Sequence, residues 1–406
     1  MIVIAIAALT QLSLPAHTAA GQDVETRNGV RLVHNKKPLW EKSPNIRLEK
    51  ILTLGDIEAE NEHVAFYMPM DMALDKQGNL YVLDTGNHRI QKFTSDGEYI
   101  ATLGRQGQGP GEFHFPLSLD VDTQGNLVIC SQYSKKIQVI DPTGEEIKSQ
   151  VVTEDFSRYV RVTSDNNLLT PAPRNSFFRD DKNVKPDPLF QRMDRQGKVT
   201  ESFGEPRDYK NALLSASGNN VNFCVGVDGS IYASFDNQNR IEKYSHDGRL
   251  IWRSDRKLKY NAEKPLYKGK IERFKGGGIN IEGPRWNSCS EAVAADDQGR
   301  VWVITLRRQL KEEEVAGTST RMTRTNQGAS ISMKPNTSGE VYETDAYNLE
   351  VYDSEGVWLY SFPLNHFGDI IRFHGDKMYI LDRLRRMQVH VYRIVPALQP
   401  KPVPVS

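Results

Sequence analysis

The feature that most constrains the fold is a pattern that repeats six times along the chain. In the first copy, residues 70–83 read Met-Asp-Met-Ala-Leu-Asp-Lys-Gln-Gly-Asn-Leu-Tyr-Val-Leu, so two apolar runs flank a Gln-Gly-Asn turn. Short apolar or alternating runs joined by such turns are typical of β-hairpins. The turn recurs near positions 78, 125, 166, 229, 299 and 375. Four strands per copy predict a β repeat architecture rather than two or three separate domains.

The ends of the chain indicate how the repeat closes. The sixth copy stops after three strands, and residues 47–55 (Arg-Leu-Glu-Lys-Ile-Leu-Thr-Leu-Gly) resemble the fourth strand of the first copy, residues 98–104. An open sheet edge invites pairing with other chains. We therefore predict an all-β fold, a six-bladed β-propeller of four-stranded antiparallel blades in which the N-terminal strand closes the sixth blade.

The repeat also predicts the domain organisation. We expect a signal peptide (1–20), an N-terminal arm (21–45), the propeller (46–396) and a C-terminal tail (397–406). The expected blades span about 70–104, 117–151, 159–203, 221–253, 290–362, and 369–395 plus 47–54. Within the fifth blade, residues 317–340 are rich in Thr, Ser and Gly, and we interpret them as a flexible polar loop.

The first two copies resemble a known repeat family. The run Gly-Asn-Leu-Tyr-Val-Leu-Asp-Thr-Gly-Asn-His-Arg-Ile (78–90), followed by Gly-Gln-Gly-Pro-Gly-Glu-Phe (107–113) leading into Pro116, is similar to the NHL repeat. Copies three to six match only in the turn and strand pattern. The resemblance implies an exported bacterial six-bladed propeller, but it does not imply one function, because such blades serve enzymes, protein-binding modules and RNA-binding modules.

The N-terminus and the composition bear on localisation. Residues 2–14 are mostly apolar and precede Pro15 and Ala-His-Thr-Ala-Ala (16–20), which predicts signal-peptide cleavage after Ala20 and a periplasmic or extracellular protein. No apolar run reaches the roughly 18–20 residues that span a bilayer, so we predict no membrane span. Three cysteines are too few for a disulfide scaffold. The 52 basic and 52 acidic residues cancel, which with export argues against a nucleic-acid binder.

Charged residues are nevertheless unevenly distributed along the chain, and the connections between strands differ in length. Residues 56–75 hold six acids and no Lys or Arg, whereas residues 253–275 hold nine basic residues and three acids. Long insertions at 170–189, 253–290 and 306–347 fall in blades three to five. Long loops inside compact repeats often carry function. We call the end of the channel formed by the loops entering each innermost strand, and by the hairpins between second and third strands, the loop face.

Arginine and aromatic residues gather in the segments that we assign to the loop face. Guanidinium forks and aromatic rings suit carboxylate, sulfate or phosphate groups. The arginines are Arg174, Arg179, Arg207, Arg285, Arg307, Arg308, Arg383, Arg385 and Arg386. The ligand-binding residues that we predict are Arg174, Phe177, Arg285, Trp286, Arg307, Arg383, His114 and Tyr133.

The hairpin pairs Asp84–Arg89 and Asp236–Arg240 could also suggest a site. We interpret both as structural, because a hairpin Asp can accept backbone N–H groups and hold the Arg that follows it.

The catalytic signatures of related propellers are incomplete. Amidating lyases of the NHL class bind zinc through Pro-His pairs, but the matching positions here are Pro69-Met70 and Pro116-Leu117. Gluconolactonase-type propellers use Glu-Gly-Pro-x-Trp, and Glu282-Gly-Pro-Arg-Trp286 matches this motif without the partner Asn residues. Asp369 and Asp382 near the axis are too few carboxylates for a calcium site. We therefore predict no catalytic residue, no metal ligand and no cofactor.

Two functions remain open. The first is a non-catalytic, monomeric binding module that holds a protein, a peptide or an anionic glycan on the loop face of blades three to five. The alternative is a metal-dependent lactonase or lyase with a cation in the central channel.

Overall fold

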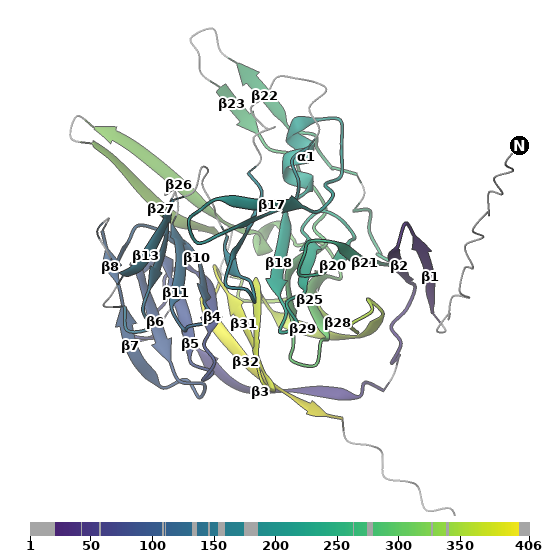
Figure 1. Ribbon diagram of the computed structural model, residues 1–406, viewed down its shortest axis with the longest axis horizontal. Helices are drawn as coiled ribbons and strands as arrows, with labels where there is room; N and C mark the ends of the chain where they lie inside the picture. Colours follow the sequence, from purple (N-terminus) through teal and green to yellow (C-terminus); the bar gives the residue numbers. More distant parts are fainter. Residues whose placement is uncertain are drawn as a thin grey trace, which may run out of the picture.

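In the described part of the chain, the six largest β-sheets are arranged as blades around a central channel (Figure 1). The computed structural model describes residues 21–41, 43–56, 58–107, 109, 111–131, 136–144, 147–152, 159–173, 186–262, 264–273, 279–325, 328–337 and 341–397. Within these residues each blade has four antiparallel strands in up-and-down order, and the predicted six-bladed β-propeller is confirmed.

The first three blades are built from consecutive strands. Blade one comprises β4 (Pro69–Leu74), β5 (Leu80–Asp84), β6 (Arg89–Phe93) and β7 (Tyr99–Leu103). Blade two comprises β10 (Pro116–Val121), β11 (Leu127–Ser131), β12 (Lys136–Ile140) and β13 (Ile147–Val152). Blade three comprises β14 (Arg161–Val162), β15 (Leu168–Pro171), β16 (Phe190–Met193) and β17 (Val199–Phe203).

The last three blades carry the insertions and the ring closure. Blade four comprises β18 (Val221–Val225), β19 (Ile231–Phe235), β20 (Ile241–Tyr244) and β21 (Leu250–Arg256). Blade five comprises β24 (Ser290–Ala295), β25 (Val301–Leu306), β28 (Glu343–Tyr352) and β29 (Trp358–His366). Blade six comprises β30 (Ile370–His374), β31 (Lys377–Asp382), β32 (Gln388–Pro396) and β3 (Ile46–Leu54).

The closing strand is the one that the repeat predicted. β3 pairs antiparallel with β32 from Ile46↔Pro396 to Leu54↔Val389, with one irregularity between Lys50 and Leu52. The N-terminal strand therefore completes blade six, as predicted, and the ring is closed by hydrogen bonds between the two ends of the domain.

The turns of the repeat explain why most copies carry an Asp followed by a Gly. The carboxylate of Asp75 accepts the backbone N–H groups of Gln77 (3.0 Å) and Asn79 (2.9 Å). Gly78 has φ +81°, a conformation in which a side chain would be strained. Four more aspartates accept two backbone N–H groups each in the same way: Asp122, Asp194, Asp296 and Asp353. The repeated Asp is thus a structural residue of the turn, at the end of the channel opposite the loop face.

Short elements decorate this ring. β1 (Gln22–Arg27) and β2 (Val30–Asn35) form a hairpin, and β2 adds in parallel to β21, so part of the arm extends blade four. β8 (Arg105–Gln106) and β9 (Glu112–Phe113) pair in parallel between blades one and two. The remaining elements are η1 (Thr85–Asn87), α1 (Ala212–Gly218), η3 (Glu312–Glu314), β22 (Lys270–Arg273), β23 (Ile279–Glu282), β26 (Ala316–Thr325) and β27 (Gly328–Thr337).

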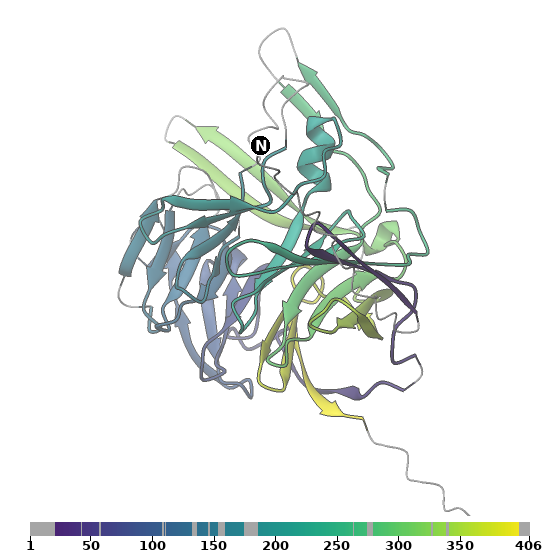
Figure 2. The ribbon, with the colours of Figure 1, turned by 45° about the vertical axis from the view of Figure 1, so that its right-hand side comes forward.

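Two hairpins project from the ring on one side. β22–β23 and β26–β27 both extend beyond the blades in two views (Figures 1 and 2). β26 and β27 pair over ten residues, from Ala316↔Thr337 to Thr325↔Gly328. The interpretation of residues 317–340 as a loop is therefore wrong for its described part. Its Thr and Ser residues alternate as a strand permits, and backbone pairing outweighs the polar composition.

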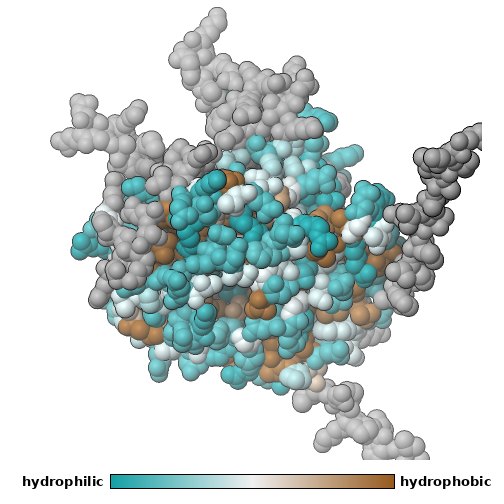
Figure 3. Space-filling view, viewed as in Figure 1, coloured by the Kyte–Doolittle hydropathy of each residue, from teal (hydrophilic) through white to brown (hydrophobic). Residues whose placement is uncertain are grey.

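The core lies between the blades. The side chains of Trp252, Trp302, Tyr81 and Tyr232 are among the largest that are fully buried. The first strands of successive blades contact one another around the channel, and we call them the inner strands. The surface seen in Figure 3 is mainly hydrophilic, with small scattered apolar patches. In the described part of the chain, no helix is long and apolar enough to cross a membrane.

Candidate functional site

The middle of the channel is closed by a buried ion-pair cluster. Arg161 of β14 donates to Asp71 of β4 (Nη1–Oδ2, 2.9 Å), and Arg372 of β30 donates to the other carboxylate oxygen (Nη2–Oδ1, 2.8 Å). Arg161 also donates to the hydroxyl of Ser118 (3.0 Å). We call Asp71, Ser118, Arg161 and Arg372 the channel plug.

The plug is electrostatically satisfied. Asp71 is only 1% exposed. Burial by itself would raise the pKa of Asp71, but the charges of Arg161 and Arg372 hold that pKa below its ordinary value. Four of the six blades are tied together at this point, so the plug is a structural feature of the channel.

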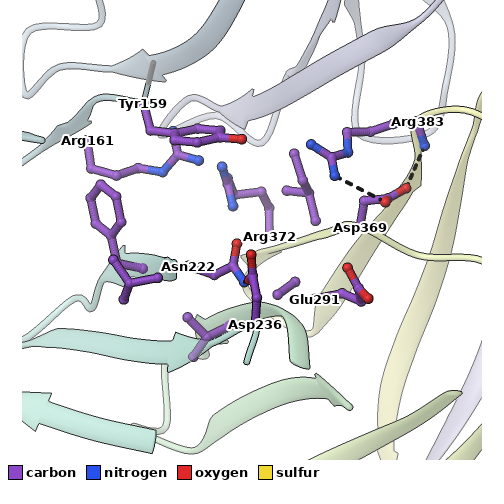
Figure 4. A pocket seen from close by; sticks show the side chains of 13 residues that line it. Tyr159, Arg161, Asn222, Asp236, Glu291, Asp369, Arg372 and Arg383 are labelled. Atoms are coloured by element: carbon purple, nitrogen blue, oxygen red, sulfur yellow. Dashed lines mark hydrogen bonds and ion pairs between the residues drawn. The ribbon is translucent and has the colours of Figure 1, made fainter. Parts of the chain in front are cut away.

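Above the plug, on the loop face, acidic side chains from three blades converge (Figure 4). Glu291 lies at the start of β24, Asp369 directly precedes β30, and Asp236 directly follows β19. They line a cavity of about 110 Å³ together with Tyr159 and with Arg383, which lies beside Asp369. All inner strands run in the same direction and begin at the loop face. Residues near the starts of these strands therefore lie close together even when they belong to distant copies of the repeat.

The three carboxylates differ in how they are held. Asp236 accepts a hydrogen bond from the amide of Asn222 (2.7 Å), and Asp369 accepts the backbone N–H (2.9 Å) and a guanidinium N–H (3.2 Å) of Arg383. Among the described residues, Glu291 has neither a hydrogen bond nor an ion pair. Burial and the charges of Asp236 and Asp369 raise the pKa of Glu291 to about 8. Its carboxyl is therefore mainly protonated at neutral pH.

A larger cavity of about 400 Å³ adjoins this mouth and has Glu291, Asp369 and Arg383 in common with it. It lies between blades five and six and under the segments 266–288 and 306–316. Its rim is apolar: Leu266 is 67% exposed and Val315 is 51% exposed. Cavities of this size accommodate small organic ligands, whereas the smaller one alone does not.

At the base of the larger cavity lies a buried arginine without a partner. Arg385 is 4% exposed, and its three guanidinium nitrogens have no hydrogen-bond partner in the described part of the chain. Its guanidinium carbon lies 4.9 Å from the centroid of the Phe367 ring, and its own backbone N–H donates to Asp382 (2.9 Å). Burial lowers the pKa of Arg385. A buried cation with five free donors is costly, and an anion in the cavity would remove that cost.

The neighbouring carboxylates do not supply this anion. Asp382 accepts the backbone N–H groups of Leu384, Arg385 and Arg386, and no ion pair with Arg385 is formed. Burial and the nearby charge of Asp369 raise the pKa of Asp382 to about 6. Glu314 is bound by both terminal nitrogens of Arg308, at 2.7 Å each. The acids near Arg385 are therefore already engaged elsewhere.

The structure brings two of the predicted ligand-binding residues to this cavity. Trp286 and Arg383 both line it. Arg285 instead packs over the Tyr267 ring, with 5.4 Å to the centroid, and Arg307 lies at 3.8 Å from Asp345. His114 stacks beside His88 on blade one, at 5.9 Å. Arg174, Phe177 and Tyr133 lie outside the described residues.

Two further expectations change. Asp84 does pair with Arg89 (2.8 Å), as the hairpin interpretation predicts, but Arg240 pairs with Glu242 and leaves Asp236 to face the channel. The carboxylate of Glu282 accepts the Tyr267 hydroxyl (2.8 Å) and does not line either cavity, so the Glu-Gly-Pro-Arg-Trp sequence contributes only its Trp to the site.

The sequence did not point to Glu291. It placed Arg385 among the loop-face arginines but not among the predicted ligand-binding residues, and it indicated a structural role for Asp236. The available signal for Glu291 was its place at the start of an inner strand, whereas Asp236 and Arg385 lie beyond the second strands of their blades. In the residues that the structure describes, no group of three or more His, Cys, Asp or Glu side chains is placed to hold a metal ion.

Comparison with known proteins agrees with the fold. A family model described as "6-bladed beta-propeller" matches residues 71–253. The chain is similar in fold to a Bacteroides vulgatus protein of the DUF4221 family, with 10% identity, a TM-score of 0.55, and 88% of this chain and 100% of that chain covered. A Bacteroides fragilis protein whose name describes it as exported gives 10% identity, a TM-score of 0.52, and coverage of 90% and 100%.

A weaker likeness is to a gluconolactonase of Xanthomonas campestris, with 13% identity, a TM-score of 0.43, and 86% of this chain and 90% of that chain covered. No curated protein matches the chain. At these identities the solved structures speak for the fold alone.

Proposed function

We propose that the protein is an exported, non-catalytic propeller, of the NHL type that its first two copies resemble, which binds a ligand through an anionic group on its loop face. The observation that carries this proposal is Arg385, a buried guanidinium without a partner at the base of a ligand-sized cavity. Arginine is suited to bidentate recognition of carboxylate-type groups. The proposed binding site lies between blades five and six. The positions of the insertions had predicted a site on blades three to five, one blade earlier in the ring.

Three observations support a binding module. The cavity combines an apolar rim with a few converging polar groups, which is typical of small-molecule sites. Arg161 and Arg372 of the channel plug line the smaller cavity, so we expect a ligand to enter and leave on the loop face. The groups that line the cavity come from blades five and six, from the segments 266–288 and 306–316 and from residues 382–385, so several elements of the fold converge on it.

The test is direct binding of a simple organic anion. Benzoate, titrated into the full chain by isothermal calorimetry, is expected to bind with one-to-one stoichiometry. The variant Arg385→Gln is expected to bind at least 10-fold more weakly, because its amide offers one donor pair in place of the guanidinium fork.

The matched control is Arg386→Gln. Arg386 is the next residue, its side chain is 40% exposed, and it lies at 3.8 Å from Asp56. This variant is expected to bind benzoate like the parent. Equal affinity of parent and Arg385→Gln for every anion tried would contradict the proposal.

The alternative of a metal-dependent lactonase or lyase is tested in the same preparation. Metal analysis of the purified protein and a lactone hydrolysis assay with and without EDTA separate the two functions. A stoichiometric metal ion together with EDTA-sensitive turnover would replace the binding module by the enzyme.

A further inference from the structure

We propose that the cavity takes a zwitterionic ligand of the amino-acid or short-peptide class, with its carboxylate on Arg385, its ammonium group at Glu291 and its apolar side chain under the rim. This inference rests on the proposed function and specifies the ligand class. It follows from which charges in the cavity lack partners and from what surrounds them.

Two groups in the joined cavities lack partners when they are ionised. Arg385 is one of them, as described above. Glu291 is the other, because none of the described residues donates a hydrogen bond to its carboxylate. By contrast Asp369 is paired with Arg383, and Glu314 with Arg308. A ligand that carries one negative and one positive group would complete both, and each new pair would form in a partly desolvated site.

The same cavity disfavours a doubly charged anion. Asp369, Asp382 and Glu314 all lie close enough to Arg385 to act on its ionisation. A phosphate or sulfate dianion placed on Arg385 would meet these three carboxyl groups with only one free cation to offset them. A monoanionic carboxylate meets less repulsion. A nearby ammonium group would favour the ionised form of Glu291 and would be attracted to Asp236.

The apolar rim specifies the third part of the ligand. Leu266, Val315 and Trp286 border the cavity, and the first two are among the most exposed large apolar side chains of the described chain. Exposed apolar side chains grouped around one opening are typical of a surface that is covered when a ligand binds. An aliphatic or aromatic side chain would cover the apolar side chains of this rim, whereas a sugar would leave them exposed to water.

The experiment compares ligands that differ by one group. L-Phenylalanine and the dipeptide Leu-Phe carry both charges, N-acetyl-L-phenylalanine lacks the ammonium group, and phenethylamine lacks the carboxylate. Calorimetry with the full chain is expected to show that a zwitterion binds at least 10-fold more tightly than either singly charged compound and than inorganic phosphate. The preferred member of the zwitterion pair distinguishes a free amino acid from a peptide.

The variant Glu291→Gln assigns the ammonium subsite. It is expected to weaken the zwitterion at least 10-fold while leaving N-acetyl-L-phenylalanine unchanged or slightly tighter. Arg385→Gln is expected to lower the affinity for both compounds, and Arg386→Gln is expected to lower the affinity for neither. Melting curves of the variants without ligand report whether the fold is retained.

The outcomes separate the two proposals. Phosphate or N-acetyl-L-phenylalanine could bind as tightly as the zwitterions and in a way that depends on Arg385. In that case the ammonium subsite is wrong, and the proposal that Arg385 binds an anion still stands. If Glu291→Gln binds the zwitterions like the parent, the assignment to Glu291 is wrong. If none of these compounds binds in a way that depends on Arg385, both proposals fail.

Discussion

Two clusters of charged side chains lie along the same channel, and they differ in whether their charges are paired with other groups of the protein. In the plug, Asp71 sits between Arg161 and Arg372, and each guanidinium also donates to a hydroxyl or a backbone carbonyl. In the cavity above it, neither the guanidinium of Arg385 nor the carboxylate of Glu291 has a hydrogen bond or ion pair with the described residues. The carboxylate of the first cluster has both of its cations within the protein, whereas we propose that the second cluster gains its partners from a ligand.

The difference separates a structural site from a binding site by physical criteria. Buried ion pairs whose hydrogen bonds are all made hold elements together, and removal of one partner leaves an uncompensated charge. Unpaired buried groups lower the stability of the free protein and are retained where they serve a function. The plug and the cavity should therefore respond in opposite directions to mutation.

The largest effect is expected at the plug. Asp71→Ala leaves Arg161 and Arg372 buried and facing each other without the carboxylate, and should lower the free energy of unfolding by about 3–5 kcal/mol. Denaturant titration followed by circular dichroism measures the change. The control Asp96→Ala removes an exposed partner of Lys377 and should change stability little. A similar small loss in both variants would show that the plug is dispensable.

The next effect depends on pH and concerns Glu291. Its pKa is raised from its ordinary value to about 8, so the folded protein holds a proton that the unfolded chain releases at lower pH. Stability should therefore fall as the pH rises through 8, by roughly 3 kcal/mol between pH 6 and pH 9. In Glu291→Gln this loss should disappear. Denaturant titrations of both proteins at the two pH values test the sign, and parallel pH profiles would refute it.

The smallest effect has the opposite sign to the first. Arg385→Met replaces an unpartnered buried guanidinium by an apolar side chain of similar length, and should raise the free energy of unfolding by about 1–2 kcal/mol while abolishing anion binding. The same change in the plug, Arg161→Met, should destabilise the protein. Thermal melts of the two variants test the comparison directly, and a loss of stability in both would remove the distinction between plug and cavity.

The fold could be predicted largely because its signals are local. Gly78 and its equivalents mark the turns, and the apolar runs around them predict the strands. The strand at 47–55 could be assigned to blade six because a three-stranded last copy leaves an edge that must be covered. The hairpin β26–β27 was missed because the Thr, Ser and Gly content of residues 317–340 is typical of a loop, although Ala329, Ile331 and Met333 alternate with Ser as in a strand.

The site could be predicted only in part. The wealth of Arg in the loop-face segments was visible, and Arg383 and Trp286 do line the cavity. Which arginine lacks a partner was not visible, because pairing depends on distances between blades. Arg385 is surrounded by Asp382, Asp369 and Glu314, and sequence alone cannot show that each of these acids is engaged elsewhere.

The sequence by itself determined the repeat, the turns and the strand that closes the ring, because these depend on backbone conformation and hydrophobic pattern within a few tens of residues. The tertiary structure alone decided which charged groups meet at the axis. Asp71, Arg161 and Arg372 come from blades one, three and six, and Glu291 and Arg385 from blades five and six. Closing the ring buries these residues together, and burial decides whether a charge has a partner in the protein or awaits one in a ligand.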